Sequence, residues 1–313
     1  MPPHRLSEDA KGVYTISATP FLDDGAIKFA SADRLVEFYI EAGVSGITIL
    51  GMMGEANKLA PIEAEGFLSH VLARVAERVP VVVGVSSPGL DNLARLSAVA
   101  MEQGAAGLMV AQAPGLNTEE KLYGYFAAVF AALGPEVPVC YLDYPFATGV
   151  AISPTLFNRM VGEFPQLVML KHEDWPGLAK LTAVRIGAER AGVRRVSILC
   201  GNGGLYLPQE LARGADGAMT GFAYLEMLVA LVSRFAAGDR DGAEDLFDAY
   251  LPLLRHEQQP GFGLAVRKEI FRRRGLITNA RTRAPGPALT ATDQAELDRL
   301  LQRLHAHPLA LHL

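Results

Sequence analysis

Lys171 is the residue of this chain whose type and position best fit a nucleophile. It closes the apolar run Leu167–Leu170 and is followed at once by the polar residues His172, Glu173 and Asp174. An ammonium group at the end of a buried strand loses hydration, which favours the neutral amine that attacks a carbonyl carbon. A lysine that reaches from a strand end into solvent is the alternative. The elements around Lys171 decide between the two.

Short apolar runs recur along the chain at intervals that suit a strand followed by a helix. The other six of the seven lysines lie outside these runs, in polar or turn-like stretches where a solvated ammonium is expected. Near-continuous apolar strands are typical of a parallel sheet covered on both faces, and eight strand–helix units close a barrel. The expected strands are Val13–Thr19, Gly46–Leu50, Val79–Val85, Gly107–Ala111, Val137–Leu142, Leu167–Lys171, Val196–Cys200 and Gly217–Thr220.

The stretches between these runs carry helix signals. Ser31, Thr118 and Ser153 stand where an N-cap is expected, and Pro61 and Pro154 occupy first-turn positions. The amphipathic stretches include Ser31–Ala42, Pro61–Glu77, Asn92–Gln103, Thr118–Leu133 and Ser153–Glu163. Several helices also end in a glycine that suits a left-handed C-cap, at Gly43, Gly104 and Gly214. We therefore predict an α/β fold, a (β/α)8 TIM barrel over residues 10–238.

The rest of the chain, residues 239–313, contains no expected strand. It is predicted to form a helical extension packed on the barrel, because no flexible linker precedes it. Its helices are expected at Asp241–Leu254, Gly263–Arg274 and Thr292–His305, with Thr292 as the N-cap of the last one.

Composition narrows the function classes. With 50% hydrophobic residues, 20% charged residues and a net charge of −5, the chain has the core of a globular protein and is a poor partner for nucleic acid. No apolar stretch reaches the roughly 18 residues that span a bilayer, and no secretory signal is visible, so we expect a cytoplasmic protein without membrane contact. Cys140 and Cys200 are expected to be buried free thiols. No cluster has zinc spacing, and neither a metal nor a cofactor is predicted.

In such barrels the active site lies at the carboxyl ends of the strands. Lys171 ends the sixth expected strand and so belongs to this face. The loop after the second strand, Gly51-Met52-Met53-Gly54-Glu55, is rich in backbone N–H groups that would hold a carboxylate, although a plain turn is the alternative. Gly201 and Asn202 after the seventh strand, and Thr220 at the end of the eighth, complete the predicted substrate-binding set.

These features together resemble the dihydrodipicolinate synthase / N-acetylneuraminate lyase family of Schiff-base-forming aldolases. The matching pattern covers almost the whole chain, and its order and spacing are specific. The resemblance implies a (β/α)8 barrel with a C-terminal helical extension, commonly a homotetramer. It also implies that Lys171 forms an imine with a 2-oxo acid such as pyruvate. The pieces are Ala18–Phe21, Asp24-Gly25, Gly51-x-x-Gly54-Glu55-Ala56, Pro80–Val85, Pro145, Thr148-Gly149, Lys171 and Gly201-Asn202.

The chain departs from the pattern that the resemblance implies for the two name-giving activities. Met52-Met53 replaces a hydroxyl-bearing pair, and Leu142 stands in the slot of the catalytic tyrosine. Ala147 replaces an arginine that grips the second substrate of the synthase, and Ala113-Pro114 lacks a further tyrosine. A lost proton relay typically lowers a rate by about 10²–10⁴-fold. The synthase reaction of lysine biosynthesis is therefore not the expected activity.

Several residues are candidates to replace the relay. Tyr144 lies two residues beyond Leu142, on the same face if the strand geometry persists, whereas Tyr141 would point away from the barrel interior. Tyr144 and Asp143 are the predicted proton carriers beside Lys171. His172, Glu173 and Glu55 are the other candidates. Only one of His172 and Glu173 should face the pocket, because adjacent side chains diverge, and Glu55 is also suited to bracing its own loop.

Three functions remain as hypotheses. The first is a class I lyase, an aldolase or a dehydratase, that acts on a 2-oxo acid such as pyruvate or a sugar-derived acid through a Schiff base on Lys171. The second is a catalytically silent barrel that binds a metabolite. The third is a metal-dependent aldolase that uses His172, Glu173 and Asp143. The predicted partners are a small-molecule 2-oxo acid and further copies of the chain in a homo-oligomer, a tetramer or a dimer.

Overall fold

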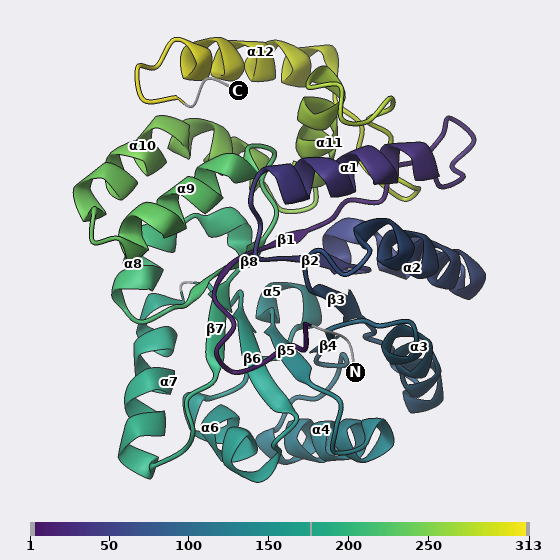
Figure 1. Ribbon diagram of the computed structural model, residues 1–313, viewed down its shortest axis with the longest axis vertical. Coiled ribbons are helices and arrows are strands. Elements are labelled where there is room, and N and C mark those ends of the chain that lie inside the picture. Colours follow the sequence, from purple (N-terminus) through teal and green to yellow (C-terminus); the bar gives the residue numbers. More distant parts are fainter. Residues whose placement is uncertain (1–3, 176, 311–313) are drawn as a thin grey trace.

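The computed structural model describes residues 4–175 and 177–310, and eight parallel strands form a closed barrel at its centre (Figure 1). Each strand pairs with the next along the chain, and β8 pairs with β1. The strands are β1 Gly12–Ile16, β2 Gly46–Ile49, β3 Val81–Gly84, β4 Gly107–Ala111, β5 Val139–Asp143, β6 Leu167–His172, β7 Ser197–Cys200 and β8 Gly217–Thr220. The predicted (β/α)8 TIM barrel is confirmed.

Helices surround the barrel, and three more follow it. The surrounding helices are α1 Phe29–Glu41, α2 Pro61–Val75, α3 Leu90–Glu102, α4 Glu119–Leu133, α6 Pro154–Glu163, α7 Leu178–Ala191, α8 Leu207–Ala212 and α9 Leu225–Ala236, whereas the single turn α5 Pro145–Thr148 lies in the loop after β5. The C-terminal extension contains α10 Arg240–Glu257, α11 Gly263–Arg273 and α12 Ala291–His305. In Figure 1 these three helices lie together on one side of the barrel, with α12 outermost. Short 3₁₀ helices occupy loops at η1 Met52–Gly54, η2 Ala56–Lys58 and η3 Asn202–Gly204.

Buried side chains form two separate hydrophobic clusters because side chains alternate across each strand. The larger cluster joins the outer face of the strands to the helices. The smaller one, which we call the interior cluster, takes its strand residues from β1 and from β3 to β8 and fills the barrel. Its buried members are Leu6, Tyr14, Ile16, Val82, Met109, Ala111, Cys140, Leu142, Met169, Leu199 and Met219. Membership of one cluster or the other therefore tells which way a strand residue points.

Most helix signals acted as predicted. Thr118 and Ser153 accept hydrogen bonds from the backbone N–H groups of Lys121 and Leu156, and Pro61 and Pro154 each begin a helix. Two N-cap predictions are wrong. Ser31 lies inside α1, whose N-cap is Lys28, and α12 is capped by Thr290, two residues before Thr292. The Thr290 hydroxyl accepts from the Asp293 N–H while the Asp293 carboxylate accepts from the Thr290 N–H, a reciprocal pair that Thr292 lacks the spacing to form.

The three glycines expected at helix ends adopt the left-handed conformation. Gly43, Gly104 and Gly214 have φ angles of 82°, 92° and 94°.

The strand predictions were accurate in position and less accurate at the strand ends. β1 is shorter than Val13–Thr19, because the chain leaves the ladder after Ile16, and β6 continues one residue past Lys171 to His172.

Cys140 and Cys200 are free and buried, as expected from the sequence. Cys140 belongs to the interior cluster and Cys200 to the outer one, so the two thiols lie on opposite faces of the sheet. Among the described residues, no helix is both long and apolar enough to cross a bilayer.

Candidate active site

Lys171 is buried and lies at the carboxyl end of β6, where its side chain is 7% exposed. Its neighbours Met169 and Leu170 belong to the interior and the outer cluster respectively, so the alternation directs Lys171 into the barrel mouth. Its Nζ atom lies 2.8 Å from Oε2 of Glu173. The prediction that Lys171 occupies the mouth of the barrel agrees with this geometry, and so does the prediction that only one of His172 and Glu173 faces the pocket.

The loop after β7 holds the Glu173 carboxylate in place. The backbone N–H of Asn202 donates to Glu173 Oε1 over 3.1 Å, and the Asn202 side-chain amide donates to the Glu173 carbonyl over 3.2 Å. An added Cβ at Gly201 would collide with the Glu173 side chain. Gly201 and Asn202, predicted as substrate-binding residues, thus position the carboxylate that contacts Lys171. The glycine-rich motif was the sequence signal for this loop, but its partner was not predicted.

Tyr144 lies on the same side of the sheet as Lys171. It is half-buried and packs against the interior cluster together with Met53, whereas Tyr141 belongs to the outer cluster and contacts Phe126 and Phe157. The predicted directions of both tyrosines are confirmed. Burial raises the pKa of the Tyr144 phenol, and the negative charge of Glu173 raises it further. Tyr144 is therefore a phenol that keeps its proton near neutral pH and stands close to the Lys171–Glu173 pair.

Asp143 points the opposite way, which argues against its expected role as a proton carrier beside Lys171. Its carboxylate is fully buried on the outer face of β5, where Oδ2 lies 2.7 Å from Nζ of Lys180 on α7. His172 shares this outer face, with Nδ1 at 3.8 Å from Asp143 Oδ2 and Nε2 at 3.0 Å from the Gly177 carbonyl oxygen. The physical reason is the alternation of side chains, which separates Asp143 from Tyr144 and His172 from Lys171.

Asp143, His172, Lys180 and Glu210 lie behind the site. They form a buried group of polar side chains that we call the polar network. Burial raises the pKa of Glu210 to about 7, against the opposing charge of His172. Burial disfavours the charged form of His172, yet Asp143 and the other nearby acceptors more than offset this and raise its pKa. Lys180 had been expected to be a solvated lysine. Its side chain is instead largely buried between Asp143 and Asp174.

The Gly51–Glu55 loop is a 3₁₀ turn whose first residues point their N–H groups out of the helix. The left-handed positions belong to Leu50 and Glu55, each with φ of 54°, rather than to the glycines. Thr19 donates its hydroxyl to the Gly54 carbonyl over 2.7 Å and so ties the loop to the end of β1. Met53 packs against the interior cluster, whereas Met52 is 45% exposed.

Glu55 braces the loop, one of the two roles that its position allowed. Its carboxylate is buried and contacts Nζ of Lys268 at 2.5 Å, Nζ of Lys58 at 3.1 Å and the backbone N–H of Arg283 at 2.8 Å. Lys268 had also been expected to be solvated. It is fully buried in α11, and burial lowers its pKa to about 8 although Glu55 favours the charged form. This ion pair fixes the loop to the C-terminal extension.

Thr220, at the end of β8, is hydrogen-bonded to the turn after β7. Its hydroxyl accepts a hydrogen bond from the Gly203 N–H over 2.7 Å, which holds the turn after β7 against the end of β8. Asn202 in that turn has φ of 50°, a conformation that is uncommon outside glycine. Together with Leu50 and Glu55, it places left-handed non-glycine residues on both sides of the mouth. Such residues tend to cluster at functional sites because the surrounding structure must hold them there.

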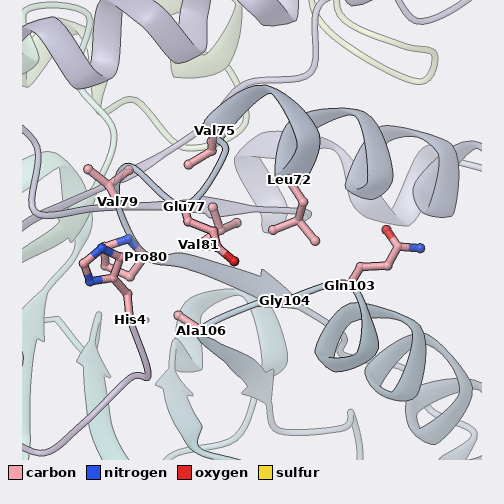
Figure 2. A pocket seen from close by; sticks show the side chains of 10 residues that line it. All are labelled: His4, Leu72, Val75, Glu77, Val79, Pro80, Val81, Gln103, Gly104 and Ala106. Atoms are coloured by element: carbon pink, nitrogen blue, oxygen red, sulfur yellow. The ribbon is translucent and has the colours of Figure 1, made fainter. Parts of the chain in front are cut away.

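Two cavities lie elsewhere. One, of about 30 Å³, is at the opposite end of the barrel near the start of β3, where His4, Val79 and Pro80 line it (Figure 2). That volume holds one or two waters and no organic substrate. The other, of about 410 Å³, lies between α11, α12 and the segment that joins them. Lys171 lines neither cavity.

Within residues 4–175 and 177–310, no group of three His, Cys, Asp or Glu residues has the arrangement of a metal site, and Glu173 faces away from His172 and Asp143.

Comparisons with known proteins identify the family of this chain. Residues 9–304 match the Dihydrodipicolinate synthetase family. The chain is 31% identical to an L-2-keto-3-deoxyarabonate dehydratase from Azospirillum brasilense over 94% of both chains. It is 34% identical to a 4-hydroxy-tetrahydrodipicolinate synthase from Thermus thermophilus, over 73% of this chain and 75% of the relative.

Solved structures give the same result. A dihydrodipicolinate synthase from Rhodopseudomonas palustris is 46% identical, covers 96% of this chain and 99% of its own, and superposes with a TM-score of 0.93. YagE from E. coli K12, solved in complex with pyruvate, is 25% identical over 95% of this chain and 99% of its own, with a TM-score of 0.86. Because the match spans the barrel and the extension, this chain belongs to the dihydrodipicolinate synthetase family, whose named relatives include both synthases and a sugar-acid dehydratase.

Proposed function

We propose that this protein is a lyase that binds a 2-oxo acid as a Schiff base on Lys171. The observation that carries the proposal is the Lys171–Glu173 pair, 2.8 Å apart and largely buried at the carboxyl end of the barrel, where sites of this fold lie. A buried amine beside a carboxylate can lose its proton to that carboxylate and attack a ketone. The membership of the family supports a lyase in general, and the dehydratase relative supports a sugar-derived 2-oxo acid as the substrate.

The proposed chemistry begins with attack of Lys171 Nζ on the C2 carbonyl carbon. Glu173 returns the proton that it took from Lys171 to the hydroxyl formed from the carbonyl oxygen, and this hydroxyl leaves as water. A protonated imine and a charged Glu173 carboxylate remain, and the imine draws electrons from C3. Glu173 takes a proton from C3, and the electron pair of that C–H bond forms the C2–C3 double bond of an enamine. The enamine electrons then expel a hydroxyl from C4, which leaves as water with a proton from Tyr144. Hydrolysis of the remaining imine releases the product and the amine, and the proton taken from C3 passes from Glu173 to the Tyr144 phenolate, which restores both groups.

Each chain group suits its proposed step. Glu173 is fixed by the Asn202 N–H, so it can accept a proton without losing its position. Tyr144 has a raised pKa and so donates a proton rather than removing one. The N–H groups at the start of η1 would hold the C1 carboxylate, in keeping with the predicted role of the Gly51–Glu55 loop. A C–C cleavage passes through the same imine and enamine, and dehydration is preferred here because of the relative from Azospirillum brasilense.

We also propose that this chain is not a true synthase, although several relatives carry that name. Condensation with an aldehyde that bears its own carboxylate calls for a cation at the position of Ala147 and a hydroxyl relay at Met52-Met53. Neither residue type is present. Turnover of pyruvate with aspartate semialdehyde is expected to be at least about 10³-fold below that of a competent synthase.

Borohydride reduction followed by mass spectrometry tests the proposed function. The protein is incubated with pyruvate and, separately, with a 2-oxo-3-deoxypentonate, and peptides are mapped after reduction. One reduced adduct on Lys171 is expected with each acid, and the pentonate should also yield a dehydrated product without borohydride. A protein that stays unmodified with both acids would contradict the proposal and favour a silent metabolite-binding barrel. Modification of a different lysine would contradict the assignment of the nucleophile.

A further inference from the structure

Arg267 of α11 is a buried guanidinium with an unmatched donor. Its side chain is 1% exposed, and its Nε atom donates to the carboxylate of Glu257 on α10. Its Nη1 atom contacts Sδ of Met53, and its buried Nη2 atom has no hydrogen-bond partner among the described residues. A guanidinium carries five N–H donors and a thioether is a weak acceptor. The edge formed by Nη1 and Nη2 is therefore short of acceptors.

This edge lies at the mouth of the barrel. Nη1 reaches the Gly51–Glu55 loop through Met53, which, like Tyr144, packs against the interior cluster. An added Cβ at Gly221, directly after β8, would collide with Nη1 and would lie 3.2 Å from the Ile16 carbonyl oxygen at the end of β1. Gly221 therefore leaves the space through which the guanidinium reaches the carboxyl ends of β1, β2 and β8.

The donor arrangement favours a planar acceptor at this edge, because Glu257 balances the charge of Arg267 but leaves its Nη2 atom without a partner among the described residues. Glu257, the carboxylate that contacts Arg267, also accepts a hydrogen bond from the Ala223 N–H over 3.0 Å. The Glu257 carboxylate contacts Nε of Arg267, whereas Nη1 on the other edge of the guanidinium contacts Met53. A planar carboxylate matches two parallel N–H donors of a guanidinium. Met53 can move aside, because an unbranched thioether adapts its shape easily.

We infer that Arg267 is a substrate-binding residue that contacts the C1 carboxylate of the 2-oxo acid, in concert with the N–H groups of the Gly51–Glu55 loop. The inference rests on the proposed function, because it assumes that the acid reacts at Lys171. It gives the loop a source of positive charge where Met52-Met53 provides no hydroxyl. It also defines the substrate class: the carbonyl carbon of the ketone must be bonded directly to a carboxylate.

Paired substitutions test the contact. Arg267→Met is combined with Glu257→Gln, so that no buried charge is left alone and the fold is preserved. The matched control is Arg274→Met with Glu226→Gln, which removes another arginine–glutamate pair, 2.5 Å apart, between the end of α11 and the barrel helix α9. Borohydride trapping is measured as a function of concentration for pyruvate and for hydroxyacetone, which has the same ketone but no carboxylate.

The Arg267 pair variant should weaken the apparent affinity for pyruvate by about 10–100-fold, the effect of a lost charged hydrogen bond. Hydroxyacetone trapping should change by less than about threefold in that variant, and both substrates should be unchanged in the control. Equal losses for the two ketones, or no loss for pyruvate, would overturn the role of Arg267.

A second background separates this inference from the proposed function. In Lys171→Met protein, pyruvate binding measured by calorimetry depends on carboxylate contacts alone. Weaker binding after the Arg267 pair substitution in that background supports the contact even if the wild-type protein forms no imine. A wild-type adduct together with unchanged binding in this background rejects the contact and leaves the proposed function intact.

Discussion

The two faces of β5 and β6 carry similar residues arranged in similar pairs. On the inner face, Lys171 lies 2.8 Å from Glu173, with Tyr144 nearby. On the outer face, Lys180 lies 2.7 Å from Asp143, with His172 nearby. Both lysines are largely buried and both are paired with a carboxylate. Burial and ion pairing therefore do not distinguish Lys171, the lysine that we propose to react, from Lys180.

What distinguishes the two pairs is the space that each one faces. The inner pair lies at the barrel mouth, beside the rim loops that contain the left-handed residues Leu50, Glu55 and Asn202. The outer pair is closed off by α7 and α8, which supply Lys180 and Glu210. Neighbours in sequence, such as Lys171 and His172, thus belong to separate environments. The substitutions below compare the two faces directly.

The largest difference is expected between the two lysines. Lys171→Met should abolish the borohydride adduct and lower turnover by at least about 10³-fold, because no imine can form. Lys180→Met should still form the adduct, yet it should lower the free energy of unfolding by about 3 kcal/mol, since Asp143 is left buried without its cation. Adduct mapping and urea unfolding of both variants check this. If the Lys180→Met variant folds but forms no adduct, the outer face takes part in the chemistry.

The two tyrosines give the next comparison. Tyr144→Phe should lower turnover by about 10²–10⁴-fold while the adduct on Lys171 still forms, because proton donation is lost but the amine remains. Tyr141→Phe removes a hydroxyl that is buried on the outer face, away from Lys171, so turnover should stay within about twofold. Single-turnover kinetics with a 2-oxo-3-deoxypentonate separate imine formation from dehydration. Equal rates for Tyr144→Phe and wild type would assign the proton to another group.

A smaller effect is expected from displacing Glu173 without removing it. Gly201→Ala places a methyl group against the Glu173 side chain and should lower turnover by up to about 10²-fold, because a displaced catalytic group loses its alignment. Gly66→Ala, in α2 with no heavy atom near the added carbon, is the control and should leave turnover unchanged. Steady-state assays at saturating substrate compare the two. Full activity of Gly201→Ala would show that the position of Glu173 is not critical.

The sequence was sufficient to predict the barrel because its signals are local. Pro61, Thr118 and Gly43 act through the residues next to them, and apolar runs report burial on both faces of a strand. Lys171 was found for the same reason, as the polar end of such a run. The sequence did not reveal which carboxylate, Asp143 or Glu173, lies beside Lys171. That depends on the residue at which the side chains of each strand stop alternating between the two faces of the sheet. β6 runs one residue beyond the expected end, and that extension keeps His172 outside and brings Glu173 inside.

The contribution of the C-terminal extension had no local signal. Lys268 lies 213 residues from Glu55 along the chain and Arg267 lies 214 residues from Met53. The sequence around them, Val-Arg-Lys-Glu-Ile, resembles an exposed helical stretch. Their burial follows from packing α11 against the rim of the barrel, which a periodicity argument does not reveal.

The smallest predicted effect concerns Glu210 and the pH dependence of stability. Its pKa is about 7 in the folded protein and near 4.5 when the chain is unfolded. Between these values the folded state binds more protons, so the free energy of unfolding decreases as the pH rises from about 4.5 to 7. The raised pKa of His172 acts with the same sign, because its stabilising charge is lost as the pH rises through its folded pKa.

Glu210→Gln keeps the side chain neutral at every pH and should remove most of this decrease. The variant should match wild type near pH 4.5 and should be more stable by on the order of 2 kcal/mol at pH 8, with a residual slope from His172. Glu189→Gln, on the exposed surface of α7, is the control and should change stability by less than about 0.5 kcal/mol. Urea unfolding from pH 4.5 to 8 measures all three proteins. If the stability of the variant depended on pH as much as that of wild type, Glu210 would be ionised across this range. The polar network of Asp143, His172, Lys180 and Glu210 would then consist of charged groups that do not share protons.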